Sequence, residues 1–412
     1  MLIRYKQDEH GKTVAVANIY TQSEHKIKTH HIDRDALWVI KKLQNSGAEA
    51  YLVGGAVRDL LLGHIPHDFD IATSASPRQV QRLFYNARII GKRFKLVHII
   101  FKEKILEVST FRSGEEVEEG NNNVFGSIEQ DAKRRDFSIN SFYYDPSNGQ
   151  LLDFNAGMED FKKKRISSVI PLDETFIEDP VRMIRAIKYA VITGFTLRFN
   201  VRMAIKKYSG ELGRISTSRL TEEVNKILAS GHSRAIIAEL KRYKLLQFML
   251  PAFSIYSDYE QVQASLATLD ERVNKAIKGG SELPLSDLLL GLVEPLIIFT
   301  GDTMSPEERF KETFRQIKVL ISPITPPNYY VERASEQLLK DRGFKTPRNC
   351  VRHQRPMTRA PRGRGQKKSR PSGGGQTKRR RPQRGAQSRP KQGQGQQSKQ
   401  QQSQQKPQRQ QA

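Results

Sequence analysis

The stretch Tyr51–Thr73, YLVGGAVRDLLLGHIPHDFDIAT, most constrains the fold, because it joins a strand, a glycine turn, a short helix and a second strand. The first strand runs into Gly54 and Gly55, where the missing Cβ lets the backbone turn sharply and approach a bulky anion. The next segment predicts a short helix that ends at Gly63, and helix N-termini favour anions. Gly54, Gly55 and Arg58 are therefore candidate phosphate ligands.

Two aspartates follow on the second apolar strand. Asp68 and Asp70 are two residues apart, so they share one face of that strand. Neighbouring carboxylates repel each other unless a cation lies between them, and hard oxygen ligands suit Mg²⁺ that bridges the phosphates of a nucleotide. A glycine pair alone usually marks a plain turn, and a lone Asp-x-Asp usually marks a solvated face. The order and spacing of the two together are far more specific.

Short β-branched and aromatic segments alternate with helical ones between residues 32 and 157. The pattern predicts an α+β domain with a small mixed sheet that helices cover on one side. Glu107 lies on a predicted strand in apolar surroundings, and a carboxylate that faces a core needs a partner or a metal ion. We therefore expect Glu107 to be a third metal ligand. The alternative is an ion pair with Arg112 or another base.

Basic residues are interleaved with Phe94 in the segment IIGKRFKLVHI. They are Lys92, Arg93 and Lys95. On composition alone, an RNA-facing or phosphate-binding loop and an exposed basic turn between strands are equally supported.

A second polar cluster comprises residues 134–136, Arg-Arg-Asp, and Asn140. Two bases, an acid and an amide within one or two helical turns can bind a triphosphate and a ribose. An Arg-Arg-Asp run can equally be a surface ion-pair cluster.

From residue 158 the pattern is helical almost throughout. Asp179 followed by Pro180 predicts a helix that starts there, with Asp179 and Arg182 on one edge. An acid and an arginine on one edge can read the edge of a base. The alternative is a surface salt bridge worth about 0.2–0.5 kcal/mol.

The C-terminal segment 351–412 holds 18 of the 69 Lys and Arg residues and none of the 44 Asp and Glu residues. It has almost no aliphatic residue, so it cannot bury enough apolar surface to offset chain entropy. We expect it to be disordered and to bind RNA through phosphate neutralisation. The alternative is a solubilising tail without a specific partner.

Other sequence features limit the cellular context. The most apolar run, Leu283–Phe299, is interrupted by charges and prolines, so we expect no membrane span. The N-terminus lacks the apolar core of an export signal. The single cysteine, Cys350, rules out an intrachain disulfide and a cysteine-based zinc site. A reducing cytoplasm fits these features.

The motifs together resemble the nucleotidyltransferase superfamily that includes bacterial poly(A) polymerases and the CCA-adding enzymes of the same class. The resemblance is strong over roughly residues 30–253. It implies a polymerase-β-like head followed by an all-helical neck and body. The expected division is an N-terminal extension (1–31), a catalytic head (32–157), a nucleotide-recognising neck (158–228), an RNA-binding body (229–350) and the disordered basic tail (351–412).

The resemblance also implies roles for individual residues. Asp68, Asp70 and Glu107 would hold Mg²⁺, and ATP would be the substrate. Phosphate contacts would come from Gly54, Gly55, Arg58 and Arg135, ribose contacts from Asp136 and Asn140, adenine contacts from Asp179 and Arg182, and a further nucleotide contact from Arg112.

The product is indicated by a single segment. Gly91–His98 resembles the poly(A) polymerases and is typically missing from CCA-adding relatives. The resemblance thus implies a polynucleotide adenylyltransferase that acts on RNA 3′ ends, with RNA contacts from Lys92, Arg93, Lys95 and the tail. RNA-decay proteins are candidate partners. The alternatives are a CCA-adding enzyme and a non-catalytic RNA-binding protein, which would have no use for three acids that repel RNA.

Overall fold

The computed structural model describes residues 2–7, 10–91, 96–102, 104–113, 125–299 and 303–355. All of them belong to one compact unit, Met1–Ala360. None of the helices in these ranges is long and apolar enough to cross a membrane.

Nine strands form one mixed sheet in the N-terminal part of the described chain, in the order β1-β2-β9-β8-β3-β4-β7-β6-β5. In this sheet β4 and β7 pair in parallel, and the other neighbours are antiparallel. The strands are β1 Leu2–Gln7, β2 Thr13–Tyr20, β3 Ala50–Val53, β4 Asp70–Thr73, β5 Ala87–Ile90, β6 Leu96–Ile100, β7 Ile105–Thr110, β8 Tyr143–Asp145 and β9 Gln150–Asp153.

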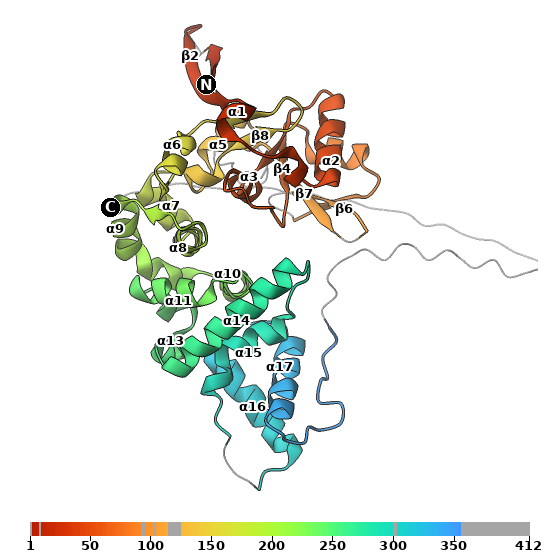
Figure 1. Ribbon diagram of the computed structural model, residues 1–412, viewed down its shortest axis with the longest axis vertical. Helices are drawn as coiled ribbons and strands as arrows, with labels where there is room; N and C mark the ends of the chain where they lie inside the picture. Colours follow the sequence, from red (N-terminus) through yellow and green to blue (C-terminus); the bar gives the residue numbers. More distant parts are fainter. Residues whose placement is uncertain are drawn as a thin grey trace, which may run out of the picture. The chain divides into compact units, whose positions relative to one another are not determined.

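Helices pack on both faces of this sheet, to different extents (Figure 1). The larger head core lies under α2, α3 and α4, and the smaller one lies between α5 and the centre of the sheet. The helices are α1 Gln22–His25, α2 Arg34–Asn45, α3 Gly55–Leu61, α4 Pro77–Leu83, α5 Ile128–Lys133 and α6 Gly157–Lys162, with short 3₁₀ turns at Thr29–His31 and Ser138–Asn140.

The alternation of side chains in the strands decides which face is closed. Leu106 and Val108 of β7 point into the larger core, whereas Glu107 between them is on the opposite face. The same holds for Ile71 and Asp70 of β4. The α+β class is confirmed, but the expectation of helices on one side only is incomplete, because α5 covers part of the second face.

The N-terminal extension contributes two strands to the sheet. Residues Thr13–Tyr20 form β2, and β1 pairs with it along its length. β2 continues into the sheet only through Asn18–Tyr20, which pair with β9. β1 was not predicted, because its residues are mostly exposed and show no apolar alternation.

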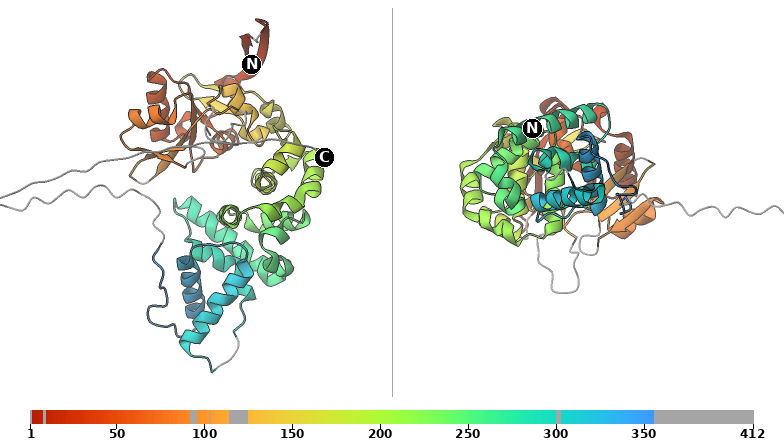
Figure 2. Two further views of the ribbon diagram at one scale, coloured as in Figure 1. Left: turned by 180° about the vertical axis from the view of Figure 1, so that it is seen from behind. Right: turned by 90° about the horizontal axis from the view of Figure 1, so that it is seen from below.

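The chain after the head is helical, apart from a two-stranded parallel sheet of β10 Arg165–Ile166 and β11 Thr196–Leu197 (Figures 1 and 2). One large core cluster includes Phe137 and Ile139 of the head together with residues of these helices. The helices are α7 Leu172–Glu178, α8 Val181–Thr193, α9 Phe199–Tyr208, α10 Thr217–Leu228, α11 Ser233–Arg242, α12 Leu246–Met249, α13 Pro251–Tyr256, α14 Glu260–Lys278, α15 Leu285–Val293, α16 Pro306–Ile321 and α17 Asn328–Asp341, with 3₁₀ turns at Ser209–Arg214 and Glu294–Leu296.

The start of α8 differs slightly from the expectation. Asp179 ends α7, and Pro180 is the N-cap residue of α8. The Asp179 carboxylate still accepts a hydrogen bond from the backbone N–H of Val181, at 3.2 Å. Asp179 therefore ends α7, and its side chain caps the first turn of α8 although Asp179 is not part of that helix.

Candidate active site

The predicted carboxylates meet at the start of β4. The parallel register places Asp70 of β4 directly beside Glu107 of β7. Asp68 lies two residues before Asp70, the first residue of β4, so it is next to the end of the strand and not within it. Two acids far apart in sequence thus become neighbours on the face opposite α2 to α4.

Asp70 has an unusual electrostatic environment. Partial burial raises the pKa of Asp70 to about 6, and the negative charges of Glu107 and Asp68 add to this effect. Arg135 and Arg185 act in the opposite direction. Loss of hydration and the two neighbouring carboxylates together therefore outweigh the nearby arginines.

Glu107 does not face the core, contrary to the sequence prediction. Its side chain is 48% exposed, and the apolar residues around it in the sequence fill the other face of the sheet. The carboxylate Oε1 lies 3.2 Å from Nε2 of His98, the cross-strand neighbour on β6. The expected need for a partner is met, but by a histidine of the adjacent strand.

The glycine turn lies next to Asp70. Gly54 has a φ of 68° and a ψ of −137°, a conformation that side chains rarely allow. A Cβ on Gly54 would lie 3.7 Å from Oδ2 of Asp70, and one on Gly55 would lie 3.6 Å from Nη2 of Arg58. The turn thus brings backbone, carboxylate and guanidinium within a few ångströms.

Arg58 is buried and held from several sides. Its guanidinium donates to Oδ1 of Asn140 at 3.0 Å and pairs with Asp59 at 2.7 Å. It also lies over the ring of Tyr189 from α8, 4.9 Å from the ring centroid. Arg58 therefore connects the glycine turn to Asn140 and to the first long helix of the neck.

Asp136 joins the head to α8 through an ion pair. Its Oδ2 accepts a hydrogen bond from Nε of Arg185 at 2.8 Å and lies 2.7 Å from Nη2 of the same guanidinium. Although burial opposes the charge, Arg185 keeps the pKa of Asp136 below its usual value. Sequence analysis missed Arg185 as a site residue, because nothing local in the sequence indicates a partner 49 positions away.

Arg135 is engaged inside the head. It donates to Oδ2 of Asp131 at 2.9 Å, and the hydroxyl of Tyr143 donates to the same oxygen at 2.6 Å. The i, i+4 spacing of Asp131 and Arg135 indicates this pair in the sequence. Its role as a phosphate ligand stays a prediction.

Arg134 and Arg112 add positive charge beside these groups. Burial, together with the positive charge of the neighbouring Arg134, lowers the pKa of Arg112 to about 10. Burial also lowers the pKa of Arg134, with contributions from Arg135 and Arg182. No hydrogen bond or ion pair of the Arg134 side chain is found within the described ranges. The sequence prediction included Arg134 in the polar cluster and assigned the phosphate contact to its neighbour Arg135.

Asp179 and Arg182 do not pair with each other. Asp179 accepts two hydrogen bonds from Nη2 of Arg219 of α10, both at 2.8 Å. Arg182 donates to Glu178 at 2.7 Å and to the hydroxyl of Thr175 at 3.1 Å. The structure thus fixes both side chains on the same segment, each through its own partner.

The predicted RNA-binding residues Lys92, Arg93 and Lys95 lie outside the described residues, as does the tail from residue 356 onward. The expected loop at 113–123 is outside them too, except for Ser113. Their roles stay predictions.

The donor set fits a divalent cation in its chemistry. Three carboxylates offer hard oxygen ligands, and the raised pKa of Asp70 reflects mutual repulsion that a dication would relieve. In the described part of the chain, no three acidic, histidine or cysteine side chains converge in the geometry of a metal site. Asp68, Asp70 and Glu107 would have to adjust their rotamers to hold one ion together.

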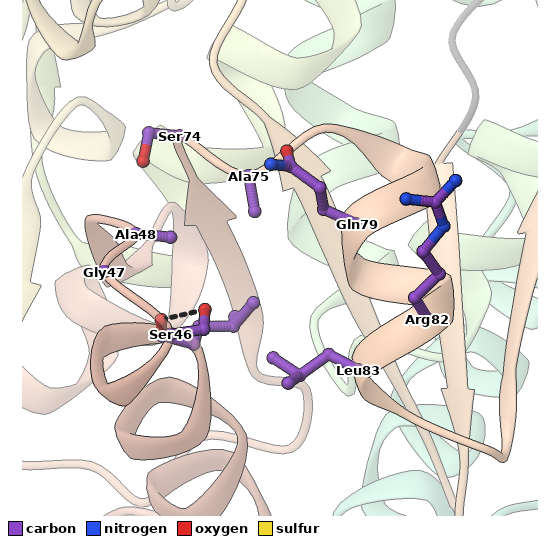
Figure 3. Close-up of a pocket in the computed structure, with 9 residues that line it drawn as sticks. Ser46, Gly47, Ala48, Ser74, Ala75, Gln79, Arg82 and Leu83 are labelled. Atoms are coloured by element: carbon purple, nitrogen blue, oxygen red, sulfur yellow. Dashed lines mark hydrogen bonds between the residues drawn. The ribbon is translucent and has the colours of Figure 1, made fainter.

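A hollow of about 390 Å³ lies elsewhere, between the end of α2 and α4 (Figure 3). Ser74 and Ala75, which follow β4, form part of its lining, together with Gln79 and Arg82. Asp70 begins β4, so the hollow is at the opposite end of that strand from the carboxylates. It is not part of the candidate site.

Two segments of the chain match families of known proteins. Residues 50–167 match the family described as the poly A polymerase head domain. Residues 194–256 match the family described as the probable RNA and SrmB-binding site of polymerase A.

Individual relatives include both kinds of enzyme. Poly(A) polymerase I of Salmonella typhi is 38% identical over 252 residues, which cover 58% of this chain and 54% of that protein. The CCA-adding enzyme of Geobacillus kaustophilus is 38% identical over 198 residues, 47% of this chain and 49% of that protein. The chain thus spans about half the length of these relatives.

A solved structure extends the similarity beyond the head. It is a tRNA nucleotidyltransferase in complex with a primer tRNA and an incoming ATP analogue, with a TM-score of 0.51 and 26% identity. The match covers 74% of this chain and 83% of that one.

Acids on a mixed sheet beside a glycine turn, followed by a helical neck, are an arrangement similar to that of nucleotidyltransferases. Over its matched residues, the chain is similar to bacterial poly(A) polymerases and CCA-adding enzymes.

Proposed function

We propose that the protein is a template-independent polynucleotide adenylyltransferase, which adds AMP from ATP to RNA 3′ ends and releases pyrophosphate. The observation that carries the proposal is the juxtaposition of Asp70 and Glu107 on parallel strands, with Gly54 beside Asp70. The head-domain match over residues 50–167 supports the same reaction class.

In this mechanism the acids of the sheet bind Mg²⁺, and the turn and arginines bind the nucleotide. The ion would help to deprotonate the RNA 3′-hydroxyl and neutralise charge on the triphosphate. Asp68, Asp70 and Glu107 provide the oxygen ligands. The turn at Gly54 and Gly55 leaves space for the triphosphate, since no Cβ fills it.

The arginines supply the positive charge that phosphate groups need. Arg58 is held in place by Asn140, so it presents its remaining N–H groups at a fixed position. Three more arginines of the head, Arg112, Arg134 and Arg135, lie close to one another. Arg134 and Arg135 add to the effect of burial in lowering the pKa of Arg112, and Arg135 does the same for Arg134. Such preorganised donors stabilise the charge that develops during phosphoryl transfer.

Contacts to the ribose and the base are assigned to the junction of head and neck. Asp136 and Asn140 are proposed for the ribose, and Asp179 and Arg182 for adenine. Arg219 holds Asp179, and Glu178 holds Arg182. Side chains fixed in this way can select a nucleotide without a template, because the wrong base would leave a buried donor or acceptor unpaired.

RNA is the proposed macromolecular partner. The segment 229–350 is proposed as an RNA-binding body. The family match over residues 194–256 overlaps its beginning and also covers part of the proposed neck. The basic segment 351–412 would bind phosphates, so affinity should fall steeply with salt concentration. A cytoplasmic protein with these partners would act in RNA decay together with decay proteins.

A nucleotide-selection assay tests the proposal. The full chain is offered an RNA primer with ATP, CTP, GTP or UTP alone, and separately a tRNA that lacks its 3′ end, with CTP and ATP. A long homopolymer of A supports the proposal. Addition that stops after C, C and A on tRNA refutes it in favour of a CCA-adding enzyme.

The CCA-adding alternative has specific support, because a CCA-adding relative is as similar over its matched residues as the poly(A) polymerase. The segment Gly91–His98 favours poly(A) addition. A non-catalytic RNA-binding protein would extend no primer with any nucleotide, while still binding RNA.

A further inference from the structure

Asp70, Glu107 and His98 form a polar row across three adjacent strands. Asp70 of β4 is in register with Glu107 of β7, which is in register with His98 of β6. All three are on the sheet face opposite the larger core. Glu107 therefore lies between a carboxylate that repels it and an imidazole 3.2 Å away.

We infer that His98 is a positioning residue, which holds the Glu107 carboxylate in place as a metal ligand. The inference deepens the proposed function and rests on it. Glu107 is 48% exposed and its neighbours Leu106 and Val108 point to the other face, so core packing does not fix its carboxylate. A cross-strand partner is the remaining restraint that the sheet supplies.

The chemistry of imidazole suits this task. A neutral imidazole with its hydrogen on Nε2 can donate to a carboxylate without bringing a permanent positive charge. A lysine or arginine in the same place would compete with a divalent cation for Glu107. Partners that orient metal ligands typically change metal affinity by about 10–100-fold when they are removed.

His98 belongs to the segment on which the choice between the two possible products was based. His98 is the last residue of the segment Gly91–His98, which separates poly(A) polymerases from CCA-adding relatives in the sequence resemblance. The structure gives one residue of that segment a defined task, because β6 delivers it directly to an acid of the site.

Metal binding by variants of the full chain tests the inference without relying on catalysis. Mn²⁺ affinity is measured by electron paramagnetic resonance, with and without a non-hydrolysable ATP analogue, for the wild type and His98→Ala. We expect the dissociation constant for Mn²⁺ to rise about tenfold in His98→Ala. The Mg²⁺ concentration for half-maximal extension should rise in parallel, while KM for ATP at saturating Mg²⁺ stays within twofold.

Two further substitutions separate positioning from a merely structural role. His98→Gln keeps an uncharged donor and should retain Mn²⁺ affinity within about threefold. His98→Lys keeps a donor but adds a permanent charge, and it should weaken Mn²⁺ binding at least as much as His98→Ala. Ile105→Ala is the matched control, since Ile105 is exposed on β7 and two residues from Glu107.

Each result decides the matter. Three results would overturn the inference. The first is a Mn²⁺ affinity of His98→Ala within twofold of the wild type, and the second is a loss of affinity in His98→Gln and Ile105→Ala as large as that in His98→Ala. The third is a wild type that binds no Mn²⁺ in either condition. A wild type that binds Mn²⁺ in a His98-dependent manner but extends no RNA overturns the proposed function instead.

Discussion

The carboxylate row of the head and the ion pairs of the neck use charge in opposite ways. In the head, Asp70 is surrounded by like charges and its pKa is raised to about 6. In the neck and at its junction with the head, Asp136 and Asp179 each have an arginine within 2.8 Å. The first arrangement is only partly offset by Arg135 and Arg185, whereas each acid of the second is paired directly with an arginine. Binding of a cation should therefore change the head strongly and the neck little.

Asp70→Asn should have the largest effect on activity. It removes a ligand and a charge from the row, so we expect primer extension to fall by more than about 10³-fold. RNA binding should change little, because the basic residues remain. Extension rates and an RNA gel-shift titration, with Ser74→Ala as a control at the other end of β4, measure both. Surviving extension would contradict the assignment of the metal ligands.

Asp136→Ala should have the largest effect on stability. The side chain is 9% exposed and forms an ion pair and a hydrogen bond with Arg185, so its loss leaves a guanidinium without its partner. We expect unfolding free energy to fall by about 3 kcal/mol in urea titrations. Asp173→Ala is the control, because Asp173 and Lys207 form an exposed pair that should contribute below about 1 kcal/mol. Equal losses in both variants would contradict the contrast.

Gly54→Ala should damage the head through the backbone. The φ of 68° is unfavourable for alanine, and the added Cβ would lie 3.7 Å from the Asp70 carboxylate. A cost of about 1–2 kcal/mol in unfolding free energy is expected, together with a higher KM for ATP. Gly210→Ala serves as the control, since an added Cβ there meets nothing within 4 Å. If the two variants were equally stable and active, the turn would not require glycine at position 54.

The pH dependence of stability gives the smallest effect. A carboxylate whose pKa is higher in the folded state than in the unfolded state costs stability when ionised, and that cost disappears as the pH falls below the unfolded value near 4. Asp70→Asn, measured in chelator, should therefore be more stable than the wild type by about 1 kcal/mol at pH 7, a figure reduced for solvent screening. The difference should shrink between pH 6 and pH 4. A difference that is constant with pH would contradict repulsion in the row.

Local patterns in the sequence were sufficient for most elements of the fold. Asp33 caps α2 with its side chain, and Ser76 followed by Pro77 starts α4, and both signals can be read from the sequence. β1 was missed because its strand conformation comes from pairing with β2 and not from its own pattern. The prediction that Glu107 faces the core was wrong, because the apolar neighbours of a residue on a strand can face the other side of the sheet.

Long-range partners were beyond sequence reasoning. The grouping of Asp68, Asp70 and Glu107 was predicted from residue type and family resemblance, and the register of β4 and β7 brings Asp70 and Glu107 together. The pairing of Asp136 with Arg185 depends on how the head meets α8. The assignment of Arg135 to phosphate stays a prediction, and the structure adds that this side chain pairs with Asp131, four residues earlier.

The parallel pairing of β4 and β7 has a consequence for the order of folding. Parallel neighbours cannot be joined by a tight hairpin, so the chain from Ser74 to Lys104 must form α4, β5 and β6 before β7 reaches β4. Loop closure makes such non-local pairing slow. During synthesis, a nascent chain that ends before β7 would have Asp70 but no Glu107 beside it. The two acids of the site are therefore side by side only once β7 has joined the sheet.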